Sequence, residues 1–328
     1  MEIELTSRLN EQKFNIWKDF LKSCDLEADT DFEQIALVWD DGELIASGCR
    51  RENLLKCIAV DKNRRGEDLT AKVLTALRQE AFNDGHRHLF LYTKPHNRDM
   101  FSSLFFYPVA QTDKVLLMEN KKDGIKEFMQ SLKPAESTGI IGAAVMNCNP
   151  FTNGHRYLIE KAAAQCGRLY VFVLSEDKSR FSAEDRFNMV KAGTSDLENV
   201  TVLPTGPYLI SSATFPTYFL KEREKAGQIQ CLLDIEIFTK YFVPRFSISR
   251  RYVGTEPLSQ MTNQYNRALC ENLPKHQIEV VEIPRLELEG TPVSASEVRK
   301  YIDNKNIEKV RELVPESTFN YVKEKGLI

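Results

Sequence analysis

Apolar and polar positions follow strand and helix spacings in turn along the first third of the chain. Half-apolar runs of strand length occur at 34–40, 43–50, 54–60 and 88–94. Apolar positions at helical spacing predict helices at 13–22, 68–84 and 124–131, and a further strand is expected at 115–119. Asp41-Gly42 lies between the first two strand runs and is typical of a hairpin turn. The pattern therefore predicts a mixed sheet flanked by helices.

The pattern changes at a polar stretch, residues 133–138, that contains the helix-breaking Pro134. We expect a domain linker there, between an N-terminal domain of residues 1–132 and a second domain of residues 139–328. In the second domain, predicted strands at 140–146, 169–174, 200–203, 252–254 and 279–283 alternate with helices at 155–166, 183–193, 260–270 and after 296. Such alternation predicts an α/β fold with a doubly wound, Rossmann-like parallel sheet, whose ligands bind beyond the carboxyl ends of the strands.

Composition narrows the classes of function. The 328 residues suit two domains, and 44 basic against 47 acidic residues leave a net charge of −3, which gives no charge excess for binding nucleic acid or an anionic membrane. The N-terminus has no basic region followed by an apolar stretch, and no segment is long and apolar enough to span a membrane, so we expect a cytoplasmic protein. Seven scattered cysteines without a CxxC pair argue against a disulfide framework or a zinc site.

The turn after the strand at 140–146 carries the strongest functional signal. It reads NCNPFTNGH from Asn147 to His155. A helix beginning at Gly154 would point its free amides and the positive end of its dipole at an anion above the strand. Gly154 would let a phosphate approach the backbone, and Thr152 and His155 could donate to phosphoryl oxygens. The alternative is a His155 that only caps the helix or packs in the core.

Two later segments add to this signal. Ser294, Ser296 and Arg299 lie at the start of a predicted helix, where they indicate either a second phosphate site or only a helix cap. Lys178 opens a cationic segment, 178–186, that follows the second strand of this domain. Its charges could compensate the β and γ phosphates as pyrophosphate leaves, and the alternative is a solvated loop.

A third candidate, Gly254-Thr255-Glu256, follows the strand near residue 252. Glu256 could accept a hydrogen bond from a ribose hydroxyl, although a simple strand-ending turn explains the segment equally well. Cys148 flanks the main turn and is expected to be a buried structural thiol, because nothing marks it as an activated thiolate. Residues 206–219 are rich in aromatic and hydroxyl side chains and either shape a substrate site or form core.

In this order on one alternating sheet, the segments resemble the nucleotidylyltransferase superfamily, with its TxGH or HxGH signature and its late ISSTxVR-like motif. These motifs map onto residues 149–155 and 293–299, with Ala295 in place of the middle serine, and the family's Phe-Ser-x-Glu-(Glu/Asp)-Arg segment maps onto 181–186. The resemblance implies an ATP site with Thr152, His155, Lys178 and Arg299 as catalytic residues. The implied nucleotide-binding residues are Asn147, Asn149, Pro150, Phe151, Gly154, Gly254, Thr255, Glu256, Ser294 and Ser296.

Nearly the whole chain resembles the citrate lyase ligase family. The resemblance rests on the segments NCNPFTNGHRYLIEKAA, GPYLISSATFPTYFLK and RYVGTEPLSQMTNQYN. It implies that ATP, with Mg²⁺, and acetate give acetyl-adenylate and pyrophosphate. The thiol of a dephospho-CoA-derived prosthetic group, on the acyl carrier subunit of citrate lyase, would then take the acetyl group. Two alternatives remain: an adenylyltransferase that joins ATP to phosphopantetheine or a mononucleotide, and a non-catalytic nucleotide sensor.

Residues 57–74 resemble the strand-loop-helix of the GNAT acetyltransferases, which wraps the pyrophosphate of CoA. Arg64 and Arg65 are retained, but Glu67 and Asp68 would place negative charge and a side chain beside the pyrophosphate. The resemblance therefore implies a GNAT-like N-terminal domain that has lost acetyl-CoA catalysis. Docking of a CoA-like prosthetic group or of the carrier subunit is the role left open for it.

Overall fold

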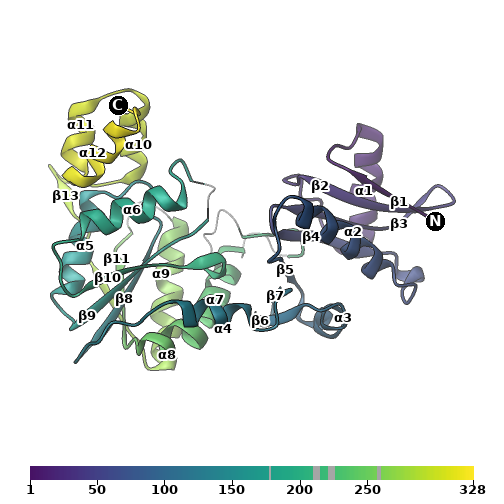
Figure 1. The fold of residues 1–328 in the computed structure, drawn as a ribbon, viewed down its shortest axis with the longest axis horizontal. Helices are drawn as coiled ribbons and strands as arrows, with labels where there is room; N and C mark the ends of the chain where they lie inside the picture. Colours follow the sequence, from purple (N-terminus) through teal and green to yellow (C-terminus); the bar gives the residue numbers. More distant parts are fainter. Residues whose placement is uncertain (177–178, 210–214, 221–225, 257–259) are drawn as a thin grey trace. The chain divides into compact units, whose positions relative to one another are not determined.

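A computed structural model describes residues 1–176, 179–209, 215–220, 226–256 and 260–328. Its contacts divide the chain into two compact units, and Figure 1 shows residues 1–124 of the first in purple to blue. The first unit comprises Met1–Gly124 together with Pro216–Ile229, and the second comprises Ile125–Phe215 together with Gln230–Ile328. Among the described residues, no helix has the length and apolar character needed to cross a membrane.

The first unit is built on a seven-stranded sheet in the order β1-β2-β3-β4-β5-β7-β6. Neighbouring strands are antiparallel except β4 and β5, which are parallel. The strands are β1 (Glu2–Thr6), β2 (Gln34–Asp40), β3 (Glu43–Arg51), β4 (Leu54–Val60), β5 (Phe90–Thr93), β6 (Tyr107–Gln111) and β7 (Leu116–Glu119). The helices are α1 (Glu11–Ser23), α2 (Leu69–Asn83) and α3 (Arg98–Ser103), with short 3₁₀ turns at Lys62–Arg64 and Pro95–Asn97.

The predicted mixed sheet and its hairpin are confirmed. β2 and β3 pair up to Asp40↔Glu43 around the turn, where Asp41 and Gly42 both have positive φ, as a type I′ turn requires. The sequence pattern misses the two edge strands. β1 has little buried surface and β6 contains Pro108, which lacks a backbone N–H and so suits an edge.

The parallel strands β4 and β5 separate towards their carboxyl ends. They pair only through Leu54↔Phe90 and Leu55↔Leu91. The hydroxyl of buried Tyr218 donates to the backbone carbonyl of Tyr92 on β5 (2.7 Å) and lies within hydrogen-bonding reach of the backbone N–H of Cys57 on β4. Tyr218 thus supplies hydrogen bonds that the two separating strands no longer give each other.

The second unit contains a five-stranded parallel sheet in the order β10-β9-β8-β11-β12. These strands are β8 (Ile141–Met146), β9 (Arg168–Val173), β10 (Val200–Pro204), β11 (Arg250–Gly254) and β12 (Glu279–Ile283). The chain runs from β8 outward to β10 and then continues at β11 on the other side of β8. The predicted doubly wound sheet is therefore confirmed, and its strand order reverses at β8, which is where such sheets bind ligands.

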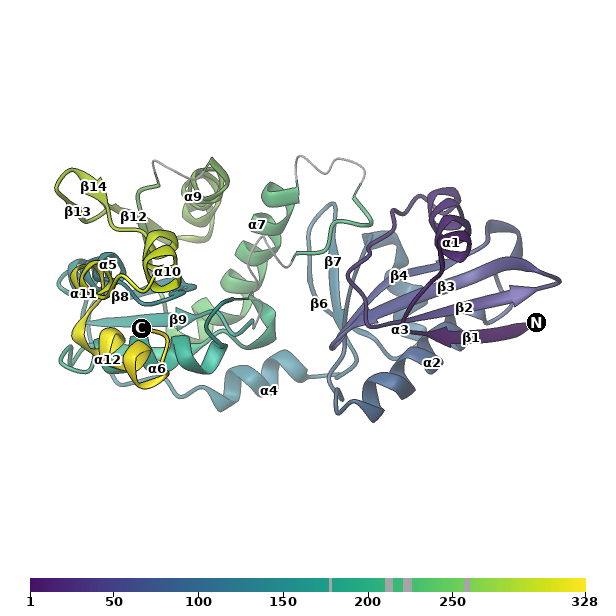
Figure 2. The ribbon, with the colours of Figure 1, turned by 90° about the horizontal axis from the view of Figure 1, so that it is seen from above.

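Helices cover both faces of this sheet. On β9, Leu169, Val171 and Val173 belong to the core that includes residues of α5 and α6, whereas Phe172 contacts Phe242 on the other face. Figure 2 shows α6 and α12 on one side of β9 and α7 on the other. The helices are α4 (Gly124–Ser131), α5 (Asn153–Ala163), α6 (Ala183–Gly193), α7 (Ala226–Ile237), α8 (Val243–Phe246), α9 (Gln260–Asn272), α10 (Ala295–Asp303), α11 (Ile307–Leu313) and α12 (Glu316–Glu324). A π-helical turn (Phe238–Phe242), 3₁₀ turns at Gly206–Tyr208 and Leu273–His276, and a small pair, β13 (Glu287–Leu288) and β14 (Thr291–Pro292), complete the unit.

The division into units differs from the predicted boundary at 133–138. Arg245 donates to the carbonyls of Met129 (2.8 Å) and Leu132 (2.7 Å), and the hydroxyl of Tyr170 accepts the backbone N–H of Ala135 (2.9 Å). These bonds join α4 and the irregular segment 133–138 to the second unit. Residues 216–229 join the first unit instead, which the order of segments along the chain does not reveal.

Candidate active site

Thr152 and His155 form a reciprocal cap at the start of α5. Thr152 Oγ1 accepts the backbone N–H of His155 (3.4 Å), and Nδ1 of His155 accepts the backbone N–H of Thr152 (3.1 Å). The sequence predicts a helix start at Gly154, but the helix begins one residue earlier because Thr152 is its N-cap. The Thr152 side chain is only 1% exposed, so its contacts serve to position His155.

The imidazole of His155 is neutral near pH 7. Burial and, to a smaller extent, the positive charge of Arg285 together lower the pKa of His155 to about 4. Because Nδ1 accepts a backbone N–H, the ring proton of the neutral form must reside on Nε2. His155 therefore offers a hydrogen-bond donor at Nε2 that carries no net charge.

Phe151 packs against the imidazole of His155. Its side chain is fully buried, and its ring stacks on the imidazole with centroids 6.1 Å apart and planes 19° apart. Gly193 of α6 makes room for this ring, because a Cβ there would lie 2.5 Å from it. The sequence predicts nucleotide contact for Phe151, and the structure restricts any such contact to its backbone. The preceding Pro150 follows a cis peptide bond.

The late motif lies directly against the first motif. A Cβ on Gly154 would lie 3.4 Å from both Cβ and the carbonyl oxygen of Val293, so this glycine brings α5 close to the segment before α10. Arg299 donates from Nη1 to the carbonyl of Asn149 (2.5 Å) and from Nη2 to Ser296 Oγ (2.9 Å). The structure thus brings together residues that are about 150 positions apart in the sequence.

Ser294 caps α10, as predicted, because its hydroxyl accepts the backbone N–H of Ser296 (3.2 Å).

The other cationic residues near this site are either bonded to neighbouring residues or not described. Arg180 forms an ion pair with Asp303 and donates to the carbonyl of Arg299 (3.3 Å). Lys178, a predicted catalytic residue, lies outside the described residues.

Arg186 has a structural role that the cationic segment 178–186 does not reveal. Its side chain is fully buried and donates to the carbonyls of Asn147 (3.0 Å), Leu174 (2.8 Å) and Phe181 (3.2 Å). It also donates to Oδ1 of Asn147 (2.6 Å), which is a predicted nucleotide-binding side chain. Arg186 therefore fixes the carboxyl ends of β8 and β9 and is not available to a phosphate.

Arg285, which sequence reasoning misses, carries a positive charge that contributes to the lowered pKa of His155. It follows β12, donates from Nε to the carbonyl of Thr255 (2.9 Å) and forms an ion pair with Glu256. The Thr255 hydroxyl accepts the backbone N–H of Arg285 (3.2 Å), and Gly254 is held through its carbonyl by Asn266 (2.8 Å). Glu256, the predicted ribose acceptor, is therefore already engaged by a cation. Arg285 follows a predicted strand of the parallel sheet, and this position is the sequence signal that could have identified it.

Cys148 is confirmed as a structural thiol. It is 1% exposed, and burial raises its pKa well above the usual value. The aromatic side chains described within 206–219 are also buried, namely those of Tyr208, Phe215, Tyr218 and Phe219. This supports the core interpretation of that segment for its described part.

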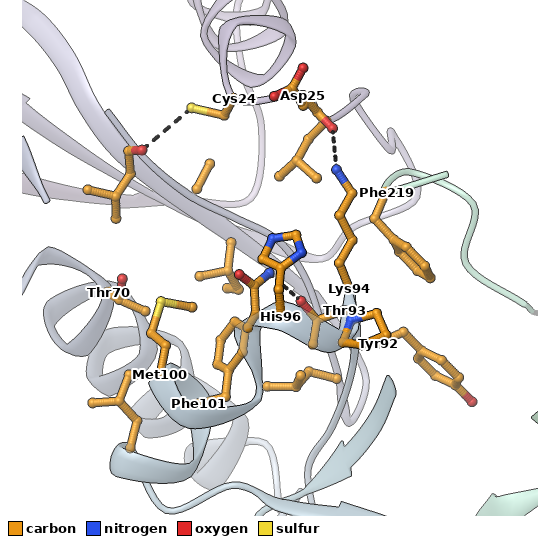
Figure 3. A pocket seen from close by; sticks show the side chains of 18 of the residues that line it. Cys24, Asp25, Thr70, Tyr92, Thr93, Lys94, His96, Met100, Phe101 and Phe219 are labelled. Carbon is orange, nitrogen blue, oxygen red and sulfur yellow. Dashed lines mark hydrogen bonds between the residues drawn. The ribbon is translucent and has the colours of Figure 1, made fainter. Parts of the chain in front are cut away.

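The first unit contains a cavity of about 970 Å³ (Figure 3). It is lined by the diverging ends of β4 and β5, by the start of α2 and by Phe219. Lys94 donates to the carbonyl of Asp25 (3.3 Å) across the cavity, and Cys24 points at the carbonyl of Val60 (3.6 Å). His96 also lines it, as Figure 3 shows.

The start of α2, beside this cavity, is poorly suited to an anion. Asp68 is its N-cap residue with φ +55°, and its side chain makes no capping bond. Arg64 forms ion pairs with Glu67 (2.6 Å) and Asp40 (2.9 Å), which lower the pKa of both carboxyl groups. The predicted obstruction of a pyrophosphate by Glu67 and Asp68 is consistent with this geometry.

The first unit has a mixed-sheet α/β fold. The second unit has a doubly wound parallel sheet, and two helix N-termini and a neutral histidine lie at its switch point. Comparison with known proteins gives the family. The family model described as "Citrate lyase ligase C-terminal domain" matches residues 141–322. The chain is 41% identical over 309 residues to "[Citrate [pro-3S]-lyase] ligase" of Klebsiella pneumoniae, covering 92% of this chain and 90% of that protein. The corresponding protein of Escherichia coli K12 is 40% identical, with 92% and 88% covered. The chain belongs to the citrate lyase ligase family and is a ligase.

More distant similarities cover only part of the chain. "Phosphopantetheine adenylyltransferase" of Clostridium botulinum strain 657 is 30% identical over 117 residues, covering 35% of this chain and 67% of that protein. An acyl-CoA N-acyltransferase from Pseudomonas aeruginosa aligns with 37% of this chain and 99% of its own at a TM-score of 0.32 and 14% identity. Thermotoga maritima TmcAL bound with alpha-thio ATP aligns with 57% of this chain and 56% of its own at a TM-score of 0.35 and 15% identity.

Proposed function

We propose that this chain uses ATP to activate acetate and transfers the acetyl group to the thiol of the citrate lyase prosthetic group. The observation that carries the proposal is the junction of the two phosphate-type motifs, in which Arg299 bonds to Asn149 beside the capped His155. Family membership supports citrate lyase as the protein acted upon.

The proposed reaction has two steps. In the first, a carboxylate oxygen of acetate attacks the α-phosphorus of ATP, the bond from that phosphorus to the bridging oxygen breaks, and pyrophosphate leaves. In the second, the thiol sulfur attacks the carbonyl carbon of acetyl-adenylate, the bond to AMP breaks, and the thiol proton is released. Neither step needs a nucleophile from this chain, so the contribution of the protein is orientation and charge stabilisation.

Each residue of the junction has a role in this proposal. The Nε2–H of His155 donates to an α-phosphate oxygen and gains strength as charge develops there. Thr152 holds the imidazole in the required tautomer, and the first amides of α5 face the same oxygens. Ser294, Ser296, Arg299 and Lys178 hold the departing pyrophosphate.

Mg²⁺ enters this proposal as part of the substrate. Within the described residues, no three His, Cys, Asp or Glu side chains gather as a set that could hold a metal. Mg²⁺ commonly binds through substrate phosphates with few protein ligands. We therefore place it on the phosphates of ATP.

The proposal is tested with the full chain, ATP, Mg²⁺, labelled acetate and deacetylated citrate lyase. The expected result is label on the acyl carrier subunit, with AMP and pyrophosphate as products. A matched reaction with His155→Ala should label the subunit at a rate lower by about 10² to 10³. Absence of label with the unaltered chain would contradict the proposal.

The similarity to phosphopantetheine adenylyltransferase favours one second candidate, an adenylyltransferase acting on a phosphorylated metabolite. Both reactions release pyrophosphate, so a pyrophosphate assay does not separate them. Dependence on acetate with AMP as the product supports the ligase. A dinucleotide-like product formed from 4′-phosphopantetheine without acetate would support the second candidate.

A further inference from the structure

Arg285 lies at the carboxyl edge of the parallel sheet, on the same edge as His155. It follows β12, which is separated from β8 only by β11. β12 pairs with β11 up to Gly254↔Ile283, and Gly254 lies against α5, because a Cβ there would be 3.1 Å from Cδ1 of Leu158. The charge of Arg285 does reach the imidazole, because it contributes to the lowered pKa of His155.

The guanidinium of Arg285 is held in a fixed orientation. Nε donates to the carbonyl of Thr255 (2.9 Å), and Nη2 pairs with the carboxylate of Glu256, which is 8% exposed. Its backbone N–H donates to the Thr255 hydroxyl (3.2 Å), and the N–H of Thr255 in turn donates to the carbonyl of Ile283 (2.9 Å). Within the described part of the chain, no residue accepts a hydrogen bond from Nη1.

A cation beside His155 would add to the donors of the late motif. His155 itself is neutral, and Arg299 is bonded to Asn149 and Ser296. A triphosphate brings several negative charges, and donors in a partly buried site bind them far better when at least one is cationic. We propose that Arg285 is a phosphate-binding residue of the ATP site, oriented beside His155 by Thr255 and Glu256.

This inference rests on the proposed function only in taking the phosphates to be those of ATP. Its test is therefore ATP binding to the full chain by calorimetry, with Mg²⁺ and without acetate. Arg285→Gln should weaken ATP binding about 10- to 100-fold, as expected for the loss of one charge-assisted hydrogen bond. If the acid-activation chemistry failed but this pattern of ATP binding were found, only the proposed function would fall.

The chain supplies a matched control on the same two strands. Arg250 forms an ion pair with Glu279 at the opposite, amino-terminal ends of β11 and β12. Arg250→Gln removes an arginine of the same kind and should leave ATP binding unchanged. If Arg285→Gln binds ATP as tightly as Arg250→Gln does, the inference is overturned.

Glu256→Gln separates a phosphate-binding role from a structural one, and it decides the question even if Arg285→Gln does not fold. The glutamine keeps an acceptor for Nη2 but removes the charge that offsets the guanidinium, so ATP binding should tighten. If Arg285 only braces the turn at Thr255, ATP binding should weaken or stay the same in this variant, and either result would show that the inference is wrong.

A second readout is the imidazole itself. The chain has five histidines, so the NMR signals of His155 can be assigned by substitution. Among the charged groups of the described residues, Arg285 is the one that contributes to the lowered pKa of His155, after burial. Arg285→Gln should therefore raise the pKa of His155 from about 4 towards the ordinary value, and Arg250→Gln should not. An unmoved pKa in Arg285→Gln would overturn the placement of the guanidinium beside His155.

Discussion

Each unit contains a strand that leads through a turn into a helix, and the two turns are built in opposite ways. In the second unit β8 leads to α5, whose N-cap Thr152 makes a reciprocal bond with His155. In the first unit β4 leads to α2, whose N-cap Asp68 has φ +55° and makes no capping bond. One helix start offers hydrogen-bond donors beside cations, and the other is surrounded by carboxylates that already occupy Arg64. A shared strand-turn-helix layout therefore does not imply a shared ligand, because the capping and pairing residues decide what can bind.

The strands beside the two turns are also held differently. At β8, buried Arg186 ties the carboxyl ends of two paired strands together. At β4, the strand has separated from β5, and Tyr218 bridges the gap from a distant segment of the chain. The first arrangement fixes the turn of the proposed phosphate site, and the second leaves room for a cavity.

The largest effect is expected at Arg186. Arg186→Met keeps the buried stem but leaves the carbonyls of Asn147, Leu174 and Phe181 without their donor, which should lower the free energy of unfolding by about 3–5 kcal/mol. Both tryptophans, Trp17 and Trp39, lie in the first unit. Urea unfolding followed by circular dichroism should therefore shift more than unfolding followed by tryptophan fluorescence.

The matched control for Arg186→Met is Arg267→Met, on an exposed position of the same unit. It should stay within about 0.5 kcal/mol of the unaltered chain. Equal losses for the two variants would show that Arg186 does not hold the strand ends.

The next effect concerns the chemistry at the first turn. His155→Ala should lower the rate of acetate-dependent exchange of pyrophosphate into ATP by about 10² to 10³, because the Nε2 donor acts mainly on charge that develops in the transition state. His96→Ala, in the cavity of the first unit, should leave that rate unchanged. A His155→Ala protein with a normal exchange rate would remove the basis for treating the two turns as functionally different.

How stability depends on pH gives a third, smaller effect. Unfolded histidine takes up a proton near pH 6.5, whereas His155 in the fold does so only at about pH 4. Its folded pKa is the lower one, so the stabilisation is complete above pH 6.5 and is lost as the pH falls from 6.5 towards 4. The shift of roughly 2.5 units corresponds to a loss of up to about 3 kcal/mol.

Denaturant unfolding at several pH values, with His155→Gln as the comparison, isolates this contribution from those of the other histidines. The difference in unfolding free energy between the two proteins should shrink as the pH falls through this window. A difference that is constant between pH 7 and pH 4 would mean that the imidazole is not protected from protonation in the fold.

Sequence reasoning predicted most of the fold because most helices and strands have clear signals in their own local sequence. The hairpin at Asp41-Gly42 and the alternating elements from β8 to α6 need only spacing and turn residues. Helix α7 and the π-helical turn after it were missed, since their nearly continuous apolar sequence hides helical periodicity. The transfer of 216–229 to the first unit is a tertiary property that no local pattern encodes.

In the candidate site, too, the residues that lie in local sequence motifs could be predicted, and those placed only by the tertiary fold could not. Thr152, His155 and Arg299 lie in short motifs, and the structure brings them together. Arg285 has no motif around it and is defined only by the sheet order and by its partner Glu256. Arg186 lies within a motif, but only its burial shows that it serves the strand ends and not a ligand.

The smallest effect is expected at the bridge in the first unit. Tyr218→Phe keeps the ring but leaves the carbonyl of Tyr92 and the N–H of Cys57 without the hydroxyl between them, which should cost about 1–2 kcal/mol. Here tryptophan fluorescence should shift more than circular dichroism, the reverse of the result for Arg186→Met. Tyr107→Phe on the edge strand β6 is the control and should change stability by less than about 0.5 kcal/mol. If Tyr218→Phe is as stable as this control, the separated strands do not need the bridge. The other contacts of Tyr218, such as the N–H of Glu27 that donates to its carbonyl (2.8 Å), would then be enough to hold it in the first unit.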